Sequence, residues 1–227
     1  MKILVLGDIH GRKCWYDIIS KEAPDKVIFL GDYVSTHENI TSEEQIANLK
    51  DLIEYKQQHK DSVIMLRGNH DIQHLGYYWA ECSGKYPMVA HYMSTHKDEF
   101  IDNTQWVHVE IIDGVSYLFS HAGVSKVWLD NNKLTVNDIN NQPINETFAF
   151  TPNNFGDMCG YSETQPCTWI RPATLLDCGI DGYIQVVGHT PVSTITNVSN
   201  KIWLCDALPM QYLIIEDGKP TICDWIK

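Results

Sequence analysis

Short apolar segments of this chain are repeatedly followed by residues of the types that bind metal ions. This happens five times, at Asp8 with His10, at Asp32, at Asn69 with His70, at His121, and at His189. In open α/β sheets the carboxyl ends of the strands line one crevice, so residues far apart in the chain can converge there. If the chain is still extended at residues 8 to 10, the i, i+2 spacing places Asp8 and His10 on the same side. Carboxylate, imidazole and amide ligands without thiolates suit Mn, Fe or Zn, and an aspartate can bridge two such ions.

Apolar runs alternate with amphipathic segments, which is typical of β-α-β units and a largely parallel sheet. Strands are predicted at 2–6, 26–30, 62–66, 183–187, 194–198, 201–204, 212–216 and 220–225. Helices are predicted at 12–22, from 41 to 59 after a capping box, and from 88 onward, with a hairpin at 106–119. Residues 130–182 lack sustained periodicity, so they are expected to form an irregular insertion with short helices in a single domain spanning 1–227.

The charge balance limits the classes of partner. The chain has 29 acidic and 17 basic residues and a net charge of -12. This charge argues against duplex nucleic acid and anionic membranes as partners, but not against a phosphorylated substrate, because bound cations can invert the local field. The apolar runs are too short to cross a bilayer and the first one lacks the pattern of a signal peptide, so a cytoplasmic protein is expected.

Taken in order, five segments resemble the motifs of the calcineurin-like metallophosphoesterase superfamily. They are Gly7-Asp8-Ile9-His10-Gly11, Gly31-Asp32-Tyr33-Val34, Arg67-Gly68-Asn69-His70-Asp71, Ser120-His121-Ala122-Gly123 and Gly188-His189-Thr190. The third segment and the Gly-His-Thr ending are similar to the phosphoprotein phosphatase branch, which includes small phage and bacterial serine/threonine phosphatases. The resemblance implies an α/β fold in the form of a four-layer αββα sandwich, with two mixed β-sheets flanked by helices and two ions at the strand ends.

The resemblance also implies roles for individual residues. It assigns Asp8, His10 and Asp32 to a first ion and Asp32, Asn69, His121 and His189 to a second ion. The two divalent ions are expected to be Mn²⁺, with Fe or Zn as alternatives. His70 matches a family histidine that protonates the leaving alkoxide, and Arg67 matches a residue that grips phosphate oxygens. Arg171 is a second candidate to bind the substrate phosphate, with a surface ion pair as the alternative, and Arg12 is a third candidate, with solvent exposure as the alternative.

The chain departs from the family pattern after Asp32. Phosphoprotein phosphatases continue Gly-Asp-x-Val-Asp-Arg-Gly, whereas Ser35-Thr36-His37 follow here. In the family, the missing aspartate would orient the catalytic histidine and the missing arginine would contact phosphate. Asp71 is therefore a candidate to orient His70, whereas His37 is expected to be an exposed loop residue.

Together these features predict a dinuclear metal-dependent phosphatase that hydrolyses phosphomonoesters of phosphoproteins or nucleotides by attack of metal-bound hydroxide. One alternative is a diadenosine polyphosphate hydrolase or a phosphodiesterase of the same superfamily, since the missing arginine helps to select a terminal phosphate. The other alternative is a catalytically silent scaffold. Retention of the ligand and acid positions argues against the scaffold, because protein binding requires none of them.

Overall fold

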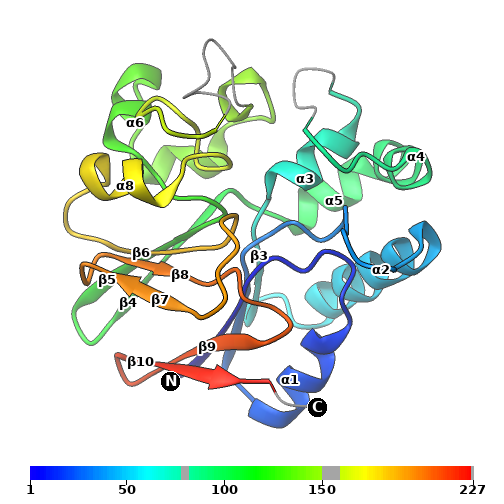
Figure 1. The fold of residues 1–227 in the computed structure, drawn as a ribbon, viewed down its shortest axis with the longest axis horizontal. Coiled ribbons are helices and arrows are strands. Elements are labelled where there is room, and N and C mark those ends of the chain that lie inside the picture. The colour runs from blue at the N-terminus through cyan, green and yellow to red at the C-terminus, as the bar shows by residue number, and fades with distance from the viewer. Residues whose placement is uncertain (78–81, 150–158, 226–227) are drawn as a thin grey trace.

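The computed structural model describes residues 1–77, 82–149 and 159–225, whose strands form two five-stranded mixed sheets (Figure 1). The first sheet has the order β10-β9-β1-β2-β3. Its strands are β1 (Lys2–Leu6), β2 (Lys26–Phe29), β3 (Val63–Met65), β9 (Gln211–Glu216) and β10 (Lys219–Asp224). Strands β1, β2 and β3 are parallel to one another, and the antiparallel hairpin β9-β10 extends the sheet from the free edge of β1.

The second sheet has the order β4-β5-β6-β8-β7. Its strands are β4 (Val107–Ile112), β5 (Val115–Ser120), β6 (Ile184–Val187), β7 (Thr196–Val198) and β8 (Ile202–Leu204). Strands β5, β6 and β8 run parallel, and an antiparallel strand lies at each edge. The carboxyl ends of β1, β2, β5 and β6 therefore open into loops that can meet at one end of the molecule.

Helices cover the outer faces of the sheets. They are α1 (Cys14–Glu22), α2 (Ser42–Gln58), α3 (Asn69–Ile72), α4 (Pro87–Thr95), α5 (Lys97–Asn103), α6 (Lys126–Asn132) and α8 (Pro172–Cys178), with short 3-10 turns η1 (Gln73–Leu75), η3 (Val136–Asn141) and η4 (Glu146–Phe148). Helix α2 begins at the predicted capping box, because Thr41 Oγ1 accepts the Glu44 N–H at 3.2 Å and Glu44 Oε2 accepts the Thr41 N–H at 2.8 Å. Between β5 and β6 the described residues form only short helices, and residues 150–158 of the predicted insertion lie outside the described part.

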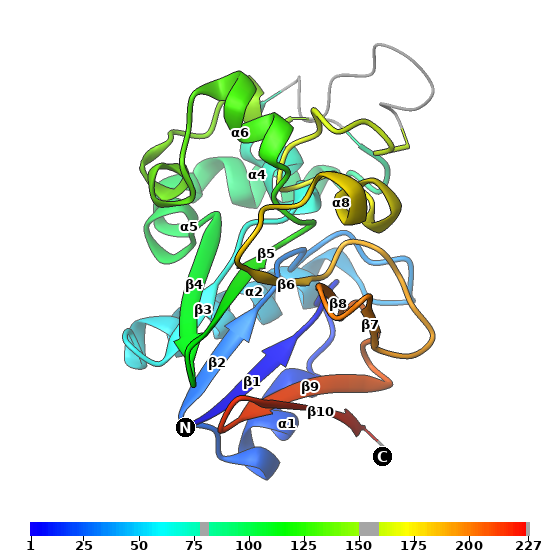
Figure 2. The ribbon, with the colours of Figure 1, turned by 90° about the vertical axis from the view of Figure 1, so that its left-hand side faces the viewer.

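The alternation of side chains along β1 explains the layering. Leu4 and Leu6 belong to a core cluster with residues of α1 and α2, whereas Ile3 and Val5 belong to a cluster with Phe119 of the second sheet. A third cluster joins α8 to β6 and β8. The turned view shows α6 and α8 on the side of the second sheet and α1 beside β9 and β10 (Figure 2). The predicted sandwich of two mixed sheets between helices is therefore confirmed. Within the described ranges, no helix combines the length and the apolarity needed to cross a bilayer.

Candidate metal centre

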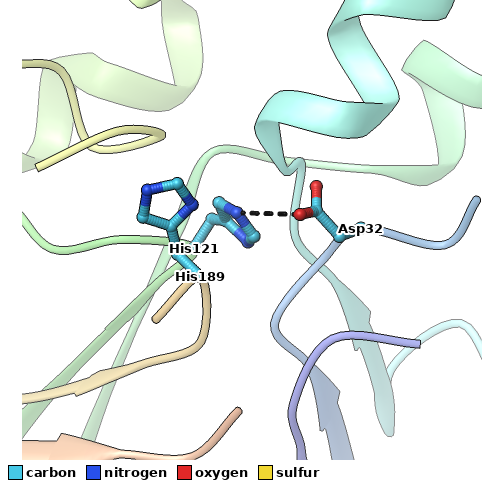
Figure 3. Close-up of side chains that lie close together, drawn as sticks. All are labelled: Asp32, His121 and His189. Carbon is cyan, nitrogen blue, oxygen red and sulfur yellow. Dashed lines mark ion pairs between the residues drawn. The ribbon is translucent and has the colours of Figure 1, made fainter. Parts of the chain in front are cut away.

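The loops at the carboxyl ends of the strands bring the six predicted metal ligands together. Two groups form, Asp8 with His10 and Asp32, and Asp32 with His121 and His189, and within each group all ligand atoms lie within 4.8 Å of one another. Asp32 belongs to both groups, as a bridging ligand would. Figure 3 shows the two imidazoles of the second group side by side and Asp32 facing them, with His121 Nε2 3.3 Å from Asp32 Oδ2. Asn69 completes this group, because its Oδ1 lies 2.9 Å from both His121 Nε2 and His189 Nδ1.

Each of the three histidines in these groups is held by a backbone carbonyl. The contacts are His10 Nδ1 to Val34 O at 2.9 Å, His121 Nδ1 to Leu30 O at 2.9 Å, and His189 Nε2 to Trp169 O at 3.2 Å. Because a carbonyl oxygen only accepts hydrogen bonds, the nitrogen that faces it carries the ring proton, and the other nitrogen presents a lone pair. When neutral, all three rings thus have the tautomer that coordinates a metal ion.

Three of the candidate ligands have left-handed backbone geometry, which is uncommon outside glycine. The φ angles are 44° at His10, 50° at Asp32 and 62° at His189. The extended geometry considered for residues 8 to 10 is therefore wrong at His10. A tight turn brings His10 back to Asp8 instead. The backbone N–H of His10 holds this turn by donating to Asp32 O at 2.7 Å. Strained backbone of this kind persists where surrounding contacts fix it, and it clusters at functional sites.

The charges of the centre fit a cation. Asp8 and Asp32 are each 1% exposed, and Asp8 accepts the His189 N–H at 3.0 Å. Burial and the neighbouring Asp206 raise the pKa of Asp8. Burial by itself lowers the pKa of His121, but the carboxylates of Asp32 and Asp8 outweigh it and raise this pKa to about 10. The carboxylates thus hold a proton on a ligand histidine, in the place where divalent ions would supply the positive charge.

Glycine leaves room for the same carboxylates. A Cβ at residue 188 would lie 2.2 Å from Asp8 Oδ1, and a Cβ at residue 68 would lie 2.0 Å from Asp32 Oδ1. Any side chain at either position would displace a predicted ligand. The space and the oxygen and nitrogen donors together fit two divalent ions.

His70 lies beside the two ligand groups and belongs to neither. Its ring packs edge-on against that of His10, with 5.4 Å between the centroids, and its backbone N–H donates to Asp32 Oδ1 at 2.9 Å. Its Nδ1 lies 3.0 Å from Nε2 of Gln73, a residue that sequence reasoning missed. The sequence feature that could have identified Gln73 is its i, i+3 spacing from His70, which places both residues on the same helical face.

Asp71 does not take the predicted position beside His70. Its carboxylate accepts three backbone N–H groups, from Asp32 at 2.9 Å, Tyr33 at 2.8 Å and Gly68 at 2.8 Å. These bonds tie the loop after β2 to the loop after β3. Asp71 therefore supports the backbone of the bridging ligand, and the orientation of His70 is left to Gln73.

Arg67 bonds to the end of α5, and its role in binding phosphate stays a prediction. Its guanidinium donates to Thr104 Oγ1 at 2.9 Å, to Thr104 O at 2.6 Å and to Ile101 O at 2.8 Å. It also lies 4.8 Å from the ring centroid of Trp106, and its side chain is buried. Arg67 caps the carbonyls at the end of α5, where a cation is favourable.

The other two arginines lie at the centre. Arg171 Nη1 donates to His189 O and to Thr190 Oγ1, both at 3.0 Å. Arg12 Nη1 donates to Asp8 O at 3.1 Å, but its Nε is paired with Glu38 at 2.7 Å. Arg171 is thus the arginine that is better placed for phosphate. His37 is exposed, as expected.

Substitution of the two arginines by methionine is expected to separate these roles. Arg171→Met should lower kcat/KM by about 10- to 100-fold, because charge-assisted hydrogen bonds to phosphate contribute about 1.5 to 3 kcal/mol. Arg67→Met should instead lower the free energy of unfolding by about 2 to 4 kcal/mol, since buried carbonyls lose their donors. Steady-state kinetics and urea unfolding on both variants measure the difference. A raised KM with an unchanged free energy of unfolding in Arg67→Met would show that Arg67 binds the substrate.

Known proteins share this fold. The pattern of the calcineurin-like phosphoesterases matches residues 1–193. A cold-active protein-tyrosine phosphatase of Shewanella sp. has a TM-score of 0.61 and 17% identity, over 97% of this chain and 80% of its own. A protein serine/threonine phosphatase from Saccharomyces cerevisiae has a TM-score of 0.55 and 17% identity, over 100% and 81%. At these identities the likeness shows the fold. Because the family pattern covers most of the chain and the structure brings together two groups of candidate metal ligands that share Asp32, the chain belongs to the calcineurin-like phosphoesterase family and is a metal-dependent phosphoesterase.

Proposed function

We propose that this phosphoesterase hydrolyses phosphomonoesters of a phosphoprotein or a nucleotide with a pair of Mn²⁺ ions. The observation that carries the proposal is the sharing of Asp32 between two compact groups of oxygen and nitrogen donors. Mn²⁺ accepts this mixture of carboxylate, imidazole and amide ligands, with Fe or Zn as alternatives. Asp8 and His10 would hold the first ion, Asn69, His121 and His189 would hold the second, and Asp32 would bridge them.

The chain supplies the groups that bind and orient the phosphate. When bound, two such ions polarise the phosphate oxygens and activate water for in-line attack. Arg171 is anchored through Nη1 alone in the described contacts, so its other N–H groups are free to bind a phosphate oxygen. His70 packs against His10 of the first ligand group, where its ring would reach the leaving-group oxygen. Asp71 keeps the backbone of Asp32 and Gly68 in place during the reaction.

A comparison of p-nitrophenyl phosphate with bis(p-nitrophenyl) phosphate tests the proposal. We expect hydrolysis with added Mn²⁺, loss of hydrolysis with a chelator, and a preference for the monoester. Preference for the diester would overturn the monoester assignment and favour a phosphodiesterase or a dinucleoside polyphosphate hydrolase. No hydrolysis of either compound by protein with both ions bound would favour the scaffold.

A further inference from the structure

The four histidines of the centre differ in what holds their rings. A carbonyl oxygen faces one nitrogen of His10, His121 and His189, whereas an amide nitrogen faces Nδ1 of His70. The amide belongs to Gln73, which is 0% exposed. The one other group close to this Nδ1 within the described residues is the Cys82 thiol, at 3.9 Å. The partner of His70 is therefore a hydrogen-bond donor, whereas the partners of the ligand histidines are acceptors.

The orientation of the Gln73 amide is fixed by two backbone groups. Its Oε1 accepts the Cys82 N–H at 3.2 Å, and its Nε2 donates to Ser83 O at 3.1 Å. If the oxygen and the nitrogen of the amide were exchanged, the NH₂ group would face the Cys82 N–H and the amide oxygen would face Ser83 O, and neither pair can form a hydrogen bond. The end that faces His70 is therefore the NH₂ group.

A donor at Nδ1 determines the tautomer of His70. Nδ1 must offer its lone pair to the amide, so the ring proton resides on Nε2. Among the described residues no hydrogen-bond partner contacts this Nε2. When neutral, the ligand histidines present lone pairs to the centre, whereas His70 presents an N–H group. Such a group cannot coordinate an ion, but it can donate a hydrogen bond to a substrate oxygen.

The residue at the position of the missing family aspartate strengthens this arrangement. Ser35 Oγ lies 3.3 Å from Gln73 Nε2 and 2.7 Å from His74 Nε2. The two hydrogens of the amide serve its shorter contacts, with His70 Nδ1 and Ser83 O, and a hydroxyl at position 35 leaves Nδ1 of His70 without a carboxylate. A second proton on the ring would set an N–H group against the NH₂ of Gln73. Loss of the Nε2 proton to a leaving group would create an imidazole anion close to Asp32.

We propose that Gln73 is a positioning residue that holds the His70 ring with its Nε2–H toward the leaving-group oxygen, so that the site prefers phenolic over alkyl phosphate esters. The inference rests on the proposed function. In the reaction, the oxygen of water bonds to phosphorus, the bond from phosphorus to the ester oxygen breaks, and that oxygen leaves with the electron pair. The proton released by the attacking water passes to solvent. A phenolate is stable enough to leave with only a hydrogen bond from His70, whereas an alkoxide needs a proton.

Comparison of a phosphotyrosine peptide with a matched phosphoserine peptide tests this preference. Because general-acid catalysis is worth about 10²- to 10⁴-fold, we expect the wild-type kcat/KM to favour the phenolic ester by at least about 10²-fold. Gln73→Glu places an acceptor at Nδ1, which lets the ring carry a second proton. This variant should raise the ratio of serine to tyrosine turnover by about 10-fold or more.

Gln45→Glu is the matched control. Gln45 is also 0% exposed, and its Oε1 accepts the Ser35 N–H at 2.8 Å, but it does not contact His70. The same charge is buried against the same residue, Ser35, so the ratio should stay at the wild-type value. An equal shift in both variants, or no shift in Gln73→Glu, would overturn the inference.

The tautomer is also measured without turnover. We expect ¹⁵N-edited NMR of the Zn²⁺-loaded, histidine-labelled protein to show His70 protonated at Nε2 alone, and Gln73→Leu to lose this preference. A proton on Nδ1 of the wild-type protein would overturn the inference even if Gln73→Glu fails to fold. If the protein hydrolyses no phosphomonoester, the proposed function fails, whereas hydrolysis without a phenolic preference contradicts only the role of Gln73.

Discussion

Replacing Asp32 by asparagine is expected to lower turnover of the preferred phosphoester by on the order of 10³-fold, or about 4 kcal/mol of transition-state stabilisation. The reason is the membership of Asp32 in both ligand groups. Asparagine offers one neutral oxygen in place of two charged ones, so it cannot bridge two ions. Loss of one buried negative charge also weakens the binding of both ions. We therefore expect the metal content per chain to fall together with kcat/KM.

Asp25→Asn is the control for this experiment. The two aspartates lie at opposite ends of β2, and Asp25 is exposed, where its Oδ2 accepts the Lys2 N–H at 2.7 Å. Kinetics, elemental analysis and thermal unfolding on both variants give the comparison. Asp25→Asn should retain its ions and its turnover. Normal turnover by Asp32→Asn with two ions bound would contradict the bridging role.

Truncation of Trp106 to alanine should cost about 3 to 5 kcal/mol of unfolding free energy, as for other large aromatic residues in cores. The indole is 0% exposed and stacks on Phe148, with 3.7 Å between ring centroids and 5° between planes. Its Nε1–H donates to Gln142 O at 3.1 Å, and the guanidinium of Arg67 lies over the indole ring, 4.8 Å from its centroid. The side chain therefore joins β4 to the helical segment between β5 and β6.

Urea unfolding measures this loss, and Trp106→Phe is the matched comparison. Phenylalanine keeps a ring against Phe148 but loses the bond to the Gln142 carbonyl, so we expect a smaller cost, about 1 to 2 kcal/mol. Because Arg67 and Trp106 are in contact, the effects of Arg67→Met and Trp106→Ala should not add. Equal costs for the alanine and phenylalanine variants would show that stacking contributes little.

The strands and the convergence of the candidate ligands could be predicted because their signals are local. Apolar runs with following polar residues locate β1, β2 and β6, and the Thr41 capping box locates the start of α2. The ordered motifs also placed Asp8, Asp32 and His189 at strand ends that the fold brings together.

The partners of individual side chains could not be predicted in the same way. Arg67 bonds to the carbonyls of Ile101 and Thr104, which follow it by more than thirty positions, and nothing in its own motif encodes that contact. Asp71 likewise satisfies backbone N–H groups of the loop after β2. Such contacts depend on how loops meet after folding, and a local motif says nothing about them.

The left-handed backbone at His10, Asp32 and His189 limits how the metal preference of this enzyme could be redesigned. Any L-residue with a Cβ is strained in this geometry, by roughly 1 to 2 kcal/mol, and aspartate and asparagine tolerate it best. Replacing a ligand there by cysteine or glutamate, to favour a softer or larger ion, would add that backbone cost to the loss of the original bond. Asn69 is the ligand in a regular helical turn, at the first position of α3. Laboratory evolution toward another metal should therefore accumulate substitutions at Asn69 before it changes His10, Asp32 or His189.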